Sequence, residues 1–263
     1  MQENLVRLFI ALGVFLLMVS WEAISPRRQT VTRKQRWPIN LGLAFFNMAM
    51  MRLTIGGLAF FSAIDAGEKS WGLLNQLDLP FWLNAFLTWL ALDFAIYLQH
   101  IITHKWPLLW RLHQVHHSDL EFDATTAVRF HPLEILLSMF YKVAWVYALG
   151  AEPAAVIAFE IILNGAATFN HSNVNIPIKL DRILRWLIIT PDMHRIHHST
   201  IRQEIDSNYG FSISLWDRLC RTYTADPAGP QETMDIGLPR MRAPQQVRFL
   251  RLLQLPFINN GRG

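Results

Sequence analysis

The chain has 263 residues, of which 52% are hydrophobic and only 17% are charged. A soluble domain usually carries about a quarter charged residues, so this composition favours a membrane protein. The net charge is a modest +4, and we expect no nucleic-acid partner. The single cysteine, Cys220, excludes an intramolecular disulfide and is compatible with a cytosolic location for the soluble part.

Long apolar runs predict membrane-spanning helices in three places. A helix needs roughly 20 apolar residues to cross a bilayer. The expected spans are 5–24, 39–64 and 79–102. The first run resembles a signal peptide, but no small-x-small cleavage site follows it, so we expect a retained anchor.

Two further apolar runs, 133–150 and 153–169, are separated by a short turn. They predict a helical hairpin over about 133–170 that enters the membrane and returns to the same side. The two runs also contain Glu134, Lys142 and Glu160, which leaves a buried soluble core open as the alternative. Near the end of the chain, 247–257 has the pattern of a surface amphipathic helix.

Loop charges predict the orientation of these segments. The loop between the first two spans contains five basic residues: Arg27, Arg28, Arg33, Lys34 and Arg36. By the positive-inside rule this loop is cytoplasmic, so the third span returns to the cytoplasm near His100. We therefore expect an all-α integral membrane protein in which one domain, 1–263, carries a cytoplasmic histidine-rich helical cap. The cap would consist of 103–132 and 171–263.

Ten histidines gather between His100 and His198. They form one H-x3-H pair, two H-x2-H-H groups and two single residues: His100 and His104; His113, His116 and His117; His194, His197 and His198; His131 and His171. In a helix, residues three or four apart lie on one face, so the three clusters can converge as a cage of eight imidazoles. One first-row metal rarely takes more than about six ligands, and this number therefore indicates two metals. For the single residues, His131 above all, an ordinary hydrogen-bonded role stays open.

Spacing alone does not name the metal, because imidazole binds iron, zinc, copper and nickel. The sequence has no H-E-x-x-H, no G-x-S-x-G and no nucleotide-binding glycine pattern, which argues against a zinc peptidase, a serine hydrolase and a nucleotide-dependent enzyme. A non-catalytic metal-binding or metal-transport membrane protein remains the alternative of another class. Its histidines would line a path through the membrane, whereas most of these lie beyond the ends of the apolar runs.

In this order, the three clusters resemble the histidine boxes of the fatty acid hydroxylase/sterol desaturase superfamily. Shorter stretches also resemble its bacterial members: 129–134 (RFHPLE), 169–173 (FNHSN), 190–194 (TPDMH) and 216–219 (WDRL). The likeness covers roughly 33–223. One departure is Arg221, where related sequences tend to have glycine.

The resemblance implies a membrane-bound di-iron oxidoreductase that uses O2 and two external electrons to attack a C–H bond of a lipid. Hydroxylation is the leading reaction, and desaturation at the same site is the near alternative. The implied iron ligands are His100, His104, His113, His116, His117, His171, His194, His197 and His198, with His131 as an open candidate. No electron-carrying domain is fused to these boxes, so we expect a separate ferredoxin or cytochrome b5-like donor. The expected location is the bacterial inner membrane, with the site on the cytoplasmic side.

Acidic side chains are expected to orient the neutral imidazoles and to soften the charge of bound iron. The candidates by proximity are Asp93, Asp119, Glu134, Asp192, Glu204 and Asp206. Asp93 is the first choice, because an acid within a membrane run is costly without a role and because it precedes His100 by two helical turns on the same face. An ordinary capping or solvated role stays open for each of them.

Overall fold

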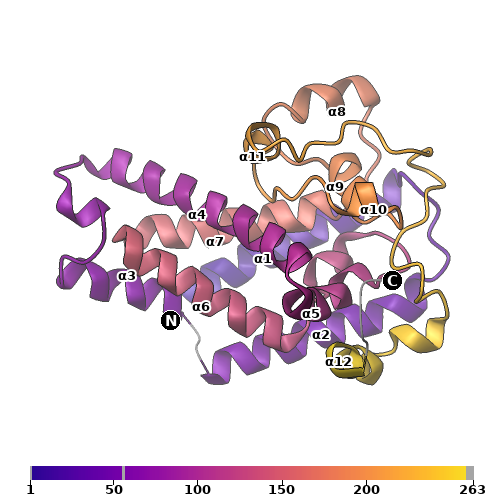
Figure 1. The fold of residues 1–263 in the computed structure, drawn as a ribbon, viewed down its shortest axis with the longest axis horizontal. Helices are drawn as coiled ribbons and strands as arrows, with labels where there is room; N and C mark the ends of the chain where they lie inside the picture. Colours follow the sequence, from indigo (N-terminus) through magenta and orange to yellow (C-terminus); the bar gives the residue numbers. More distant parts are fainter. Residues whose placement is uncertain (1, 55–56, 259–263) are drawn as a thin grey trace.

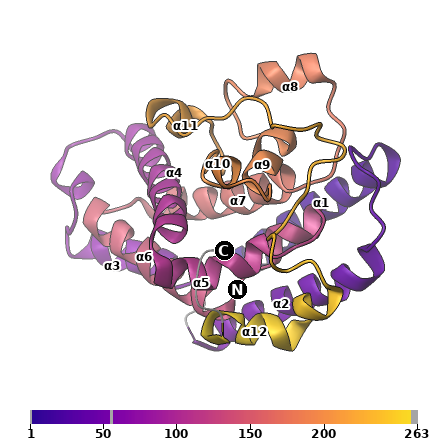
Figure 2. The same cartoon turned by 45° about the vertical axis from the view of Figure 1, so that its right-hand side comes forward.

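The structure, a computed structural model, describes residues 2–54 and 57–258. These residues form helices and three isolated bridges but no strand. The long helices make an elongated bundle: α1 (Gln2–Ile24), α2 (Arg33–Thr54), α3 (Leu58–Glu68), α4 (Phe81–Lys105), α6 (Pro132–Leu149) and α7 (Pro153–Asn170). Short helices gather at one end of it (Figures 1 and 2): α5 (Pro107–His117), α8 (Ile178–Leu184), α9 (Pro191–His197), α10 (Arg202–Ile205), α11 (Leu215–Leu219) and α12 (Phe249–Ile258). Three 3-10 turns complete the chain: η1 (Leu74–Gln76), η2 (Ala124–Val128) and η3 (Pro244–Val247). The prediction of an all-α fold with a helical cap is confirmed.

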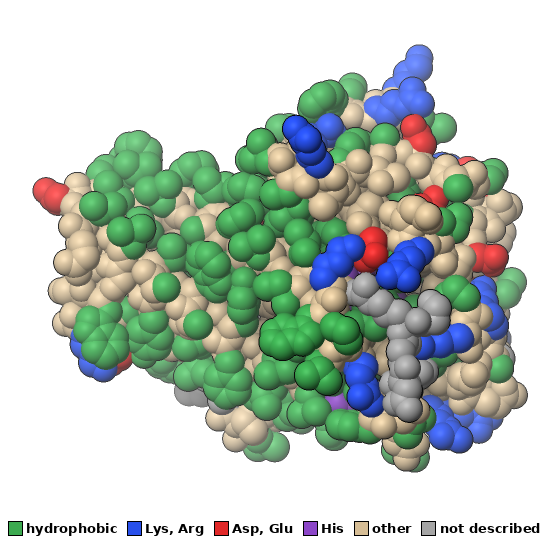
Figure 3. Space-filling view, viewed as in Figure 1, with side chains coloured by type: hydrophobic (Ala, Val, Ile, Leu, Met, Phe, Trp, Pro, Cys, Tyr) green, Lys and Arg blue, Asp and Glu red, His purple; other side chains and the backbone are tan. Residues whose placement is uncertain are grey.

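Five segments of the bundle are long and apolar enough to cross a membrane: Val6–Ile24, Arg33–Glu68, Phe81–Lys105, Pro132–Leu149 and Pro153–Asn170. Hydrophobic side chains cover the face over α3, α4 and α6 in Figure 3, whereas Lys and Arg lie mainly toward the cap. Only 17% of the apolar window of α6 and 22% of that of α7 is buried inside the protein. A buried soluble core over 133–170 therefore does not fit, and an apolar surface of this extent suits lipid.

The expected second span, 39–64, corresponds to two helices. α2 begins earlier than expected, at Arg33, because its first turns pack into the cap. There Arg36 and Asn40 are buried and donate hydrogen bonds to Asp119. α3 begins at Leu58, and 55–56 lie outside the described residues. The expected first and third spans, 5–24 and 79–102, coincide with α1 and α4 to within a few residues.

The expected hairpin over 133–170 corresponds to α6 and α7, which are joined by a short turn. Gly150 ends α6 with a φ of 66°, and Gly72, with a φ of 93°, packs directly on it. A Cβ on Gly72 would lie 2.0 Å from the Gly150 nitrogen, so this contact requires glycine. Both arms pack on α3 and α4; in addition, α6 packs on α2 and α7 packs on α1. Near the turn, Val146 of α6 and Phe159 of α7 lie in one buried cluster, and further along both helices line a cavity.

The last helix, α12, closes the cap against the bundle. It corresponds to the amphipathic helix expected at 247–257. Its Leu252 and Leu255 are buried in a cluster with Leu43 and Val115, whereas Leu250 is 70% exposed. This packing joins the end of the chain to α2 and α5.

Candidate metal centre

Nine histidines form two buried groups where the cap meets the ends of α4 and α7. Within each group, one ring nitrogen per residue lies within 4.8 Å of all the others. The first histidine group contains His100, His104, His113, His117 and His197, and the second contains His116, His171, His194 and His198. None of the nine is more than 3% exposed. The structure thus gathers the three clusters and one of the two single histidines.

Each H-x2-H-H box is divided between the two groups. In α5, the two histidines that lie four residues apart belong to the first group and the middle one to the second. The box at α9 reverses this assignment. His100 and His104, on one face of α4, complete the first group, and His171 at the end of α7 completes the second.

Backbone carbonyls fix the tautomer of several rings. Nδ1 of His100 lies 2.7 Å from the carbonyl oxygen of Tyr209, and Nδ1 of His197 lies 2.7 Å from that of Ser207. His171 makes the same contact with a carbonyl of its own helix. Because a carbonyl only accepts, Nδ1 carries the proton and the Nε2 lone pair is available. Nε2 of His100 and of His197 are buried without a hydrogen-bond partner among the described residues.

The spacing of the Nε2 atoms matches a shared metal. Nε2 of His116 and Nε2 of His194 each lie 3.1 Å from Nε2 of His171 in the second group. In the first group, Nε2 of His104 lies 3.1 Å from Nε2 of His117. Metal–nitrogen bonds of about 2.1 Å at right angles separate two nitrogens by about 3 Å. These are the distances expected between ligands of one ion.

Burial keeps the rings of the cap in the neutral form that binds metal. Desolvation lowers the pKa of His171 to about 4. Desolvation, in most cases reinforced by repulsion from neighbouring rings, also lowers the pKa well below the usual value for His116, His117, His194, His197 and His198.

One of the six acidic candidates contacts a ring of the metal centre closely. Oε1 of Glu134 lies 2.5 Å from Nδ1 of His113, which directs Nε2 of that ring into the first histidine group. Asp206 is the next nearest, with Oδ1 3.8 Å from Nδ1 of His104. A carboxylate behind a metal-binding imidazole fixes its orientation and raises its basicity.

Asp93, the first choice from the sequence, has a different partner. Its Oδ2 accepts a hydrogen bond of 2.8 Å from Nε1 of Trp216 and so ties α4 to α11. Two helical turns separate Asp93 from His100 by about 11 Å along the axis, so a shared helix face does not bring their side chains together.

The remaining acidic candidates hold the cap together. Asp119 receives a hydrogen bond of 2.7 Å from Nη2 of Arg36, and Asp192 pairs with Arg195. Glu204 accepts a hydrogen bond from a backbone N–H of the cap loop. These contacts stabilise the segments that carry the histidine boxes instead of the rings themselves.

His131 lies outside both histidine groups. Its Nδ1 accepts a hydrogen bond of 3.2 Å from the Leu133 N–H and so caps the start of α6. Its Nε2 lies 3.1 Å from the carbonyl oxygen of Leu253 in α12. Both ring nitrogens thus have partners away from the metal centre.

Some residues of the site were not identified from the sequence. The ring of Phe130 stacks on His116 with centroids 4.4 Å apart and an angle of 6° between the planes. Asn208, with a φ of 50°, lies between the two residues whose carbonyls anchor His100 and His197. Asn tolerates this left-handed conformation better than most residues, and that preference was the available signal.

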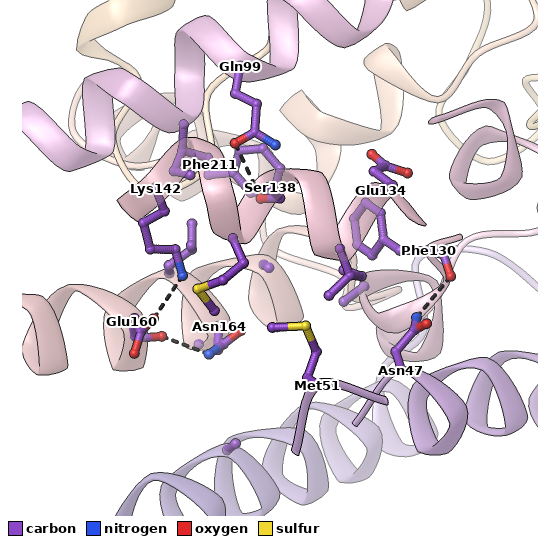
Figure 4. Close-up of a pocket in the computed structure, with 18 of the residues that line it drawn as sticks. Asn47, Met51, Gln99, Phe130, Glu134, Ser138, Lys142, Glu160, Asn164 and Phe211 are labelled. Atoms are coloured by element: carbon purple, nitrogen blue, oxygen red, sulfur yellow. Dashed lines mark hydrogen bonds and ion pairs between the residues drawn. The ribbon is translucent and has the colours of Figure 1, made fainter. Parts of the chain in front are cut away.

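A cavity of about 500 Å³, here called the bundle cavity, leads through the bundle to the first histidine group. Side chains of α1, α2, α4, α6 and α7 line it, and His100 and His113 are among them. Its wall also carries polar side chains, including Gln99, Ser138 and Asn164 (Figure 4). A second cavity of about 360 Å³ lies beside His104 on the cap side. The first histidine group is therefore reached from two directions.

Comparison with known proteins identifies the family. A model of the fatty acid hydroxylase family matches residues 85–222, just over half of the chain and a range that includes all ten histidines. The chain is 28% identical to the ornithine lipid hydroxylase OlsE of Rhizobium tropici, over 96% of this chain and 76% of that protein. It is 33% identical to the alkylglycerol monooxygenase of Xenopus tropicalis over 59% of this chain and 34% of that protein. It is 25% identical to the cholesterol 25-hydroxylase of Rattus norvegicus over 56% of this chain and 51% of that protein. No solved structure matches. With its boxes, its helical bundle and this match, the chain belongs to the fatty acid hydroxylase family.

Proposed function

We propose that this protein is an O2-dependent di-iron hydroxylase of a membrane lipid. One observation carries the proposal: a cavity within an apolar helical bundle ends at the first of two adjacent groups of buried histidines. The named relatives act on an ornithine lipid, an alkylglycerol and cholesterol, which are all lipids. The reaction class therefore agrees with the surroundings of the site.

The donor set fits two irons. Groups of five and four imidazoles lie within the roughly six ligands that a first-row metal takes, so each leaves room for a further ligand. Buried Nε2 atoms without partners, as in His100 and His197, agree with metal ligation. The proposed ligands are the nine histidines of the two groups, without His131. Bound iron would supply the O2 chemistry, with two electrons from outside the protein.

The protein itself would orient the metal ligands and keep bulk water away from the reacting groups. Glu134 holds His113, and the carbonyls of Tyr209 and Ser207 hold two further rings, so the ligands of the first group are oriented in advance. The bundle cavity would admit a chain from the bilayer beside this group, and a bound chain would displace water from it. A C–H bond of the bound lipid is thus presented where the oxidant would form.

Two alternatives are distinguishable from hydroxylation. A desaturase would use the same site, because both reactions begin by removing hydrogen, and the product decides between them. A metal transporter would need histidines along a path through the membrane. Here nine histidines close into two buried groups instead, which does not favour transport.

The proposal extends to the surroundings of the site. The basic loop after α1 supports a cytoplasmic cap in a bacterial inner membrane. A separate ferredoxin or cytochrome b5-like donor would approach from the cap side, where the second cavity beside His104 is flanked by Arg202 and Arg240. Because the bundle cavity ends at His100 of the bundle and His113 of the cap, bundle and cap are proposed to work as one domain.

The test is comparative lipid mass spectrometry on cells that produce the intact protein, His116→Ala or His131→Ala. We expect a lipid heavier by one oxygen with the intact protein and with His131→Ala, but not with His116→Ala. A product lighter by two hydrogens would replace hydroxylation with desaturation. If purified iron-loaded protein consumes no O2 with reductant and lipid, and no lipid changes in cells, the proposal is wrong.

A further inference from the structure

Three charged side chains meet in the wall of the bundle cavity, away from the histidines. Nζ of Lys142 on α6 lies 2.8 Å from Oε1 of Glu160 on α7. Nη1 of Arg7 on α1 lies 2.5 Å from Oε2 of the same carboxylate. All three line the cavity, and their side chains are 11%, 12% and 20% exposed for Lys142, Glu160 and Arg7. Figure 4 shows Lys142 and Glu160 pointing toward each other, joined by a dashed line.

This charged triad contains two cations and one carboxylate, so it carries one net positive charge. Each carboxylate oxygen already accepts from one cation, yet both cations have further N–H donors. Nε of Arg7 is buried without a hydrogen-bond partner among the described residues. Ionisable groups within a membrane span are costly, and they typically pair with one another and line the path of a substrate or ion. One cation would be enough to neutralise Glu160, so the second has no counter-charge within the triad. The other carboxylate of the cavity wall, Glu134, contacts His113, about 12 Å further along α6.

The triad lies at a defined distance from the metal centre. Glu134, Ser138 and Lys142 follow one another at four-residue intervals on the face of α6 that lines the cavity. Eight residues of helix separate Glu134, the partner of His113, from Lys142 by about 12 Å. A group bound at the triad would therefore hold the attached chain with a carbon some distance away at the histidines.

We propose that Arg7, Lys142 and Glu160 form a binding site for an anionic group of the lipid substrate, a carboxylate or a phosphate. The inference rests on the hydroxylase function proposed above and narrows its substrate class. An anion would supply the missing counter-charge and accept charge-assisted hydrogen bonds from the cations. Sterols, carotenoids and hydrocarbons carry no ionised group and cannot do so. Binding there would also select which carbon of the chain reaches the first histidine group.

The competing explanation is purely structural: the triad staples α1 to α6 and α7. The two explanations predict different effects of the same two substitutions. As a staple, the triad is weakened by Lys142→Gln and by Glu160→Gln alike. As an anion site, its charge falls to zero in Lys142→Gln and rises to +2 in Glu160→Gln, so the two substitutions move anion affinity in opposite directions.

The experiment is a lipid titration of the intact chain in neutral detergent, read by native mass spectrometry. The probes are oleate, 1-oleoyl-lysophosphatidate and the uncharged oleyl alcohol. We expect wild type to bind at least one anion about tenfold more tightly than the alcohol, the order of one charge-assisted hydrogen bond. Lys142→Gln should remove this preference and Glu160→Gln should increase it, while alcohol binding stays unchanged. Which anion binds more tightly tells a carboxylate from a phosphate.

Controls keep the result decisive. Arg52→Gln removes a cation from the bundle outside this cavity and should leave every affinity unchanged. If Glu160→Gln does not fold, the double variant Lys142→Gln/Glu160→Gln, which again carries +1, should recover most of the anion preference. Equal binding of anions and alcohol by wild type, or weaker anion binding in both single variants, overturns the proposal. This titration measures binding and no turnover, so it tests the anion site alone. If the lipid and O2 measurements above refuted the hydroxylase function, anion binding found here would still leave the anion site in place.

Discussion

Glu134 provides the sharpest test of the proposed metal centre. Its carboxylate lies 2.5 Å from Nδ1 of His113, whereas the other rings of the first group with a short Nδ1 contact, His100 and His197, rest on neutral carbonyls. A carboxylate partner makes its imidazole a stronger ligand, and loss of such a partner typically lowers metal affinity 10- to 100-fold. The sequence placed Glu134 among six candidates and preferred Asp93, so this prediction depends on the geometry.

Two substitutions separate charge from orientation. In Glu134→Gln the amide oxygen can still accept from Nδ1, so only the charge is lost, and we expect about tenfold weaker iron binding, or about 1.4 kcal/mol. Glu134→Ala loses the acceptor as well and should approach 100-fold, or about 2.7 kcal/mol. Only the first histidine group is affected, because Glu134 does not contact the second.

The assay is anaerobic titration of ferrous protein with a chelator, with iron per chain measured at each concentration. Wild type should release its two irons within a narrow range, and the variants should release one iron early and one as in wild type. Glu204→Gln is the matched control, because Glu204 is also a buried acid but, among the described residues, accepts a hydrogen bond only from a backbone N–H. Unchanged release in Glu134→Ala, or equal weakening in Glu204→Gln, would refute the assignment.

Three further outcomes follow from the same geometry. His131→Ala should keep the iron content of wild type but lower the free energy of unfolding by about 1 kcal/mol, because the N-cap of α6 is lost. His171→Ala should instead lose iron from the second group. Metal analysis and thermal unfolding tell the two variants apart. Asp93→Ala should keep both irons but destabilise the protein by about 1–3 kcal/mol, because the indole N–H of Trp216 loses its acceptor; iron loss on this substitution would contradict the structural role. Gly165→Leu places a side chain where a Cβ meets open space in the cavity wall, so iron should stay and turnover of long-chain lipid should fall at least about tenfold. Unchanged turnover would show that the substrate does not use this cavity.

Much of the fold follows from the sequence because membrane helices are set by local composition. The apolar run at 79–102 became α4 with little change, since nothing within it competes with the helix. The run at 39–64 differs from the helix found there, which begins earlier. Arg36, just before the run, and Asn40, at its start, form hydrogen bonds with Asp119 of the cap, more than 75 residues further along the chain. Such a long-range contact has no periodic signature. In the sequence, the charges of Lys142 and Glu160 likewise argue against a membrane-spanning segment. The structure shows that the two side chains pair with each other.

The metal centre shows the same limit. Helical spacing predicted that the histidine boxes would converge, because H-x2-H-H places three rings on one arc. It could not predict how each box divides between the two groups, since that depends on how α5 and α9 are rotated about their axes when they meet. Asp93 was misplaced for a related reason: periodicity gives the face of a helix but not the distance to a partner on another element.

The cap also explains how a centre built from neutral rings holds its shape. α9 has only seven residues, far fewer than the roughly 12 that an isolated helix needs to be stable in water. The charged residues next to the boxes supply the missing constraint: Asp119 follows the first H-x2-H-H box and pairs with Arg36, and Asp192 precedes the second and pairs with Arg195. Breaking a buried pair of this kind typically costs about 3–5 kcal/mol. Because these charges hold the backbone and do not touch the rings, the ligands stay neutral and in place for iron to bind.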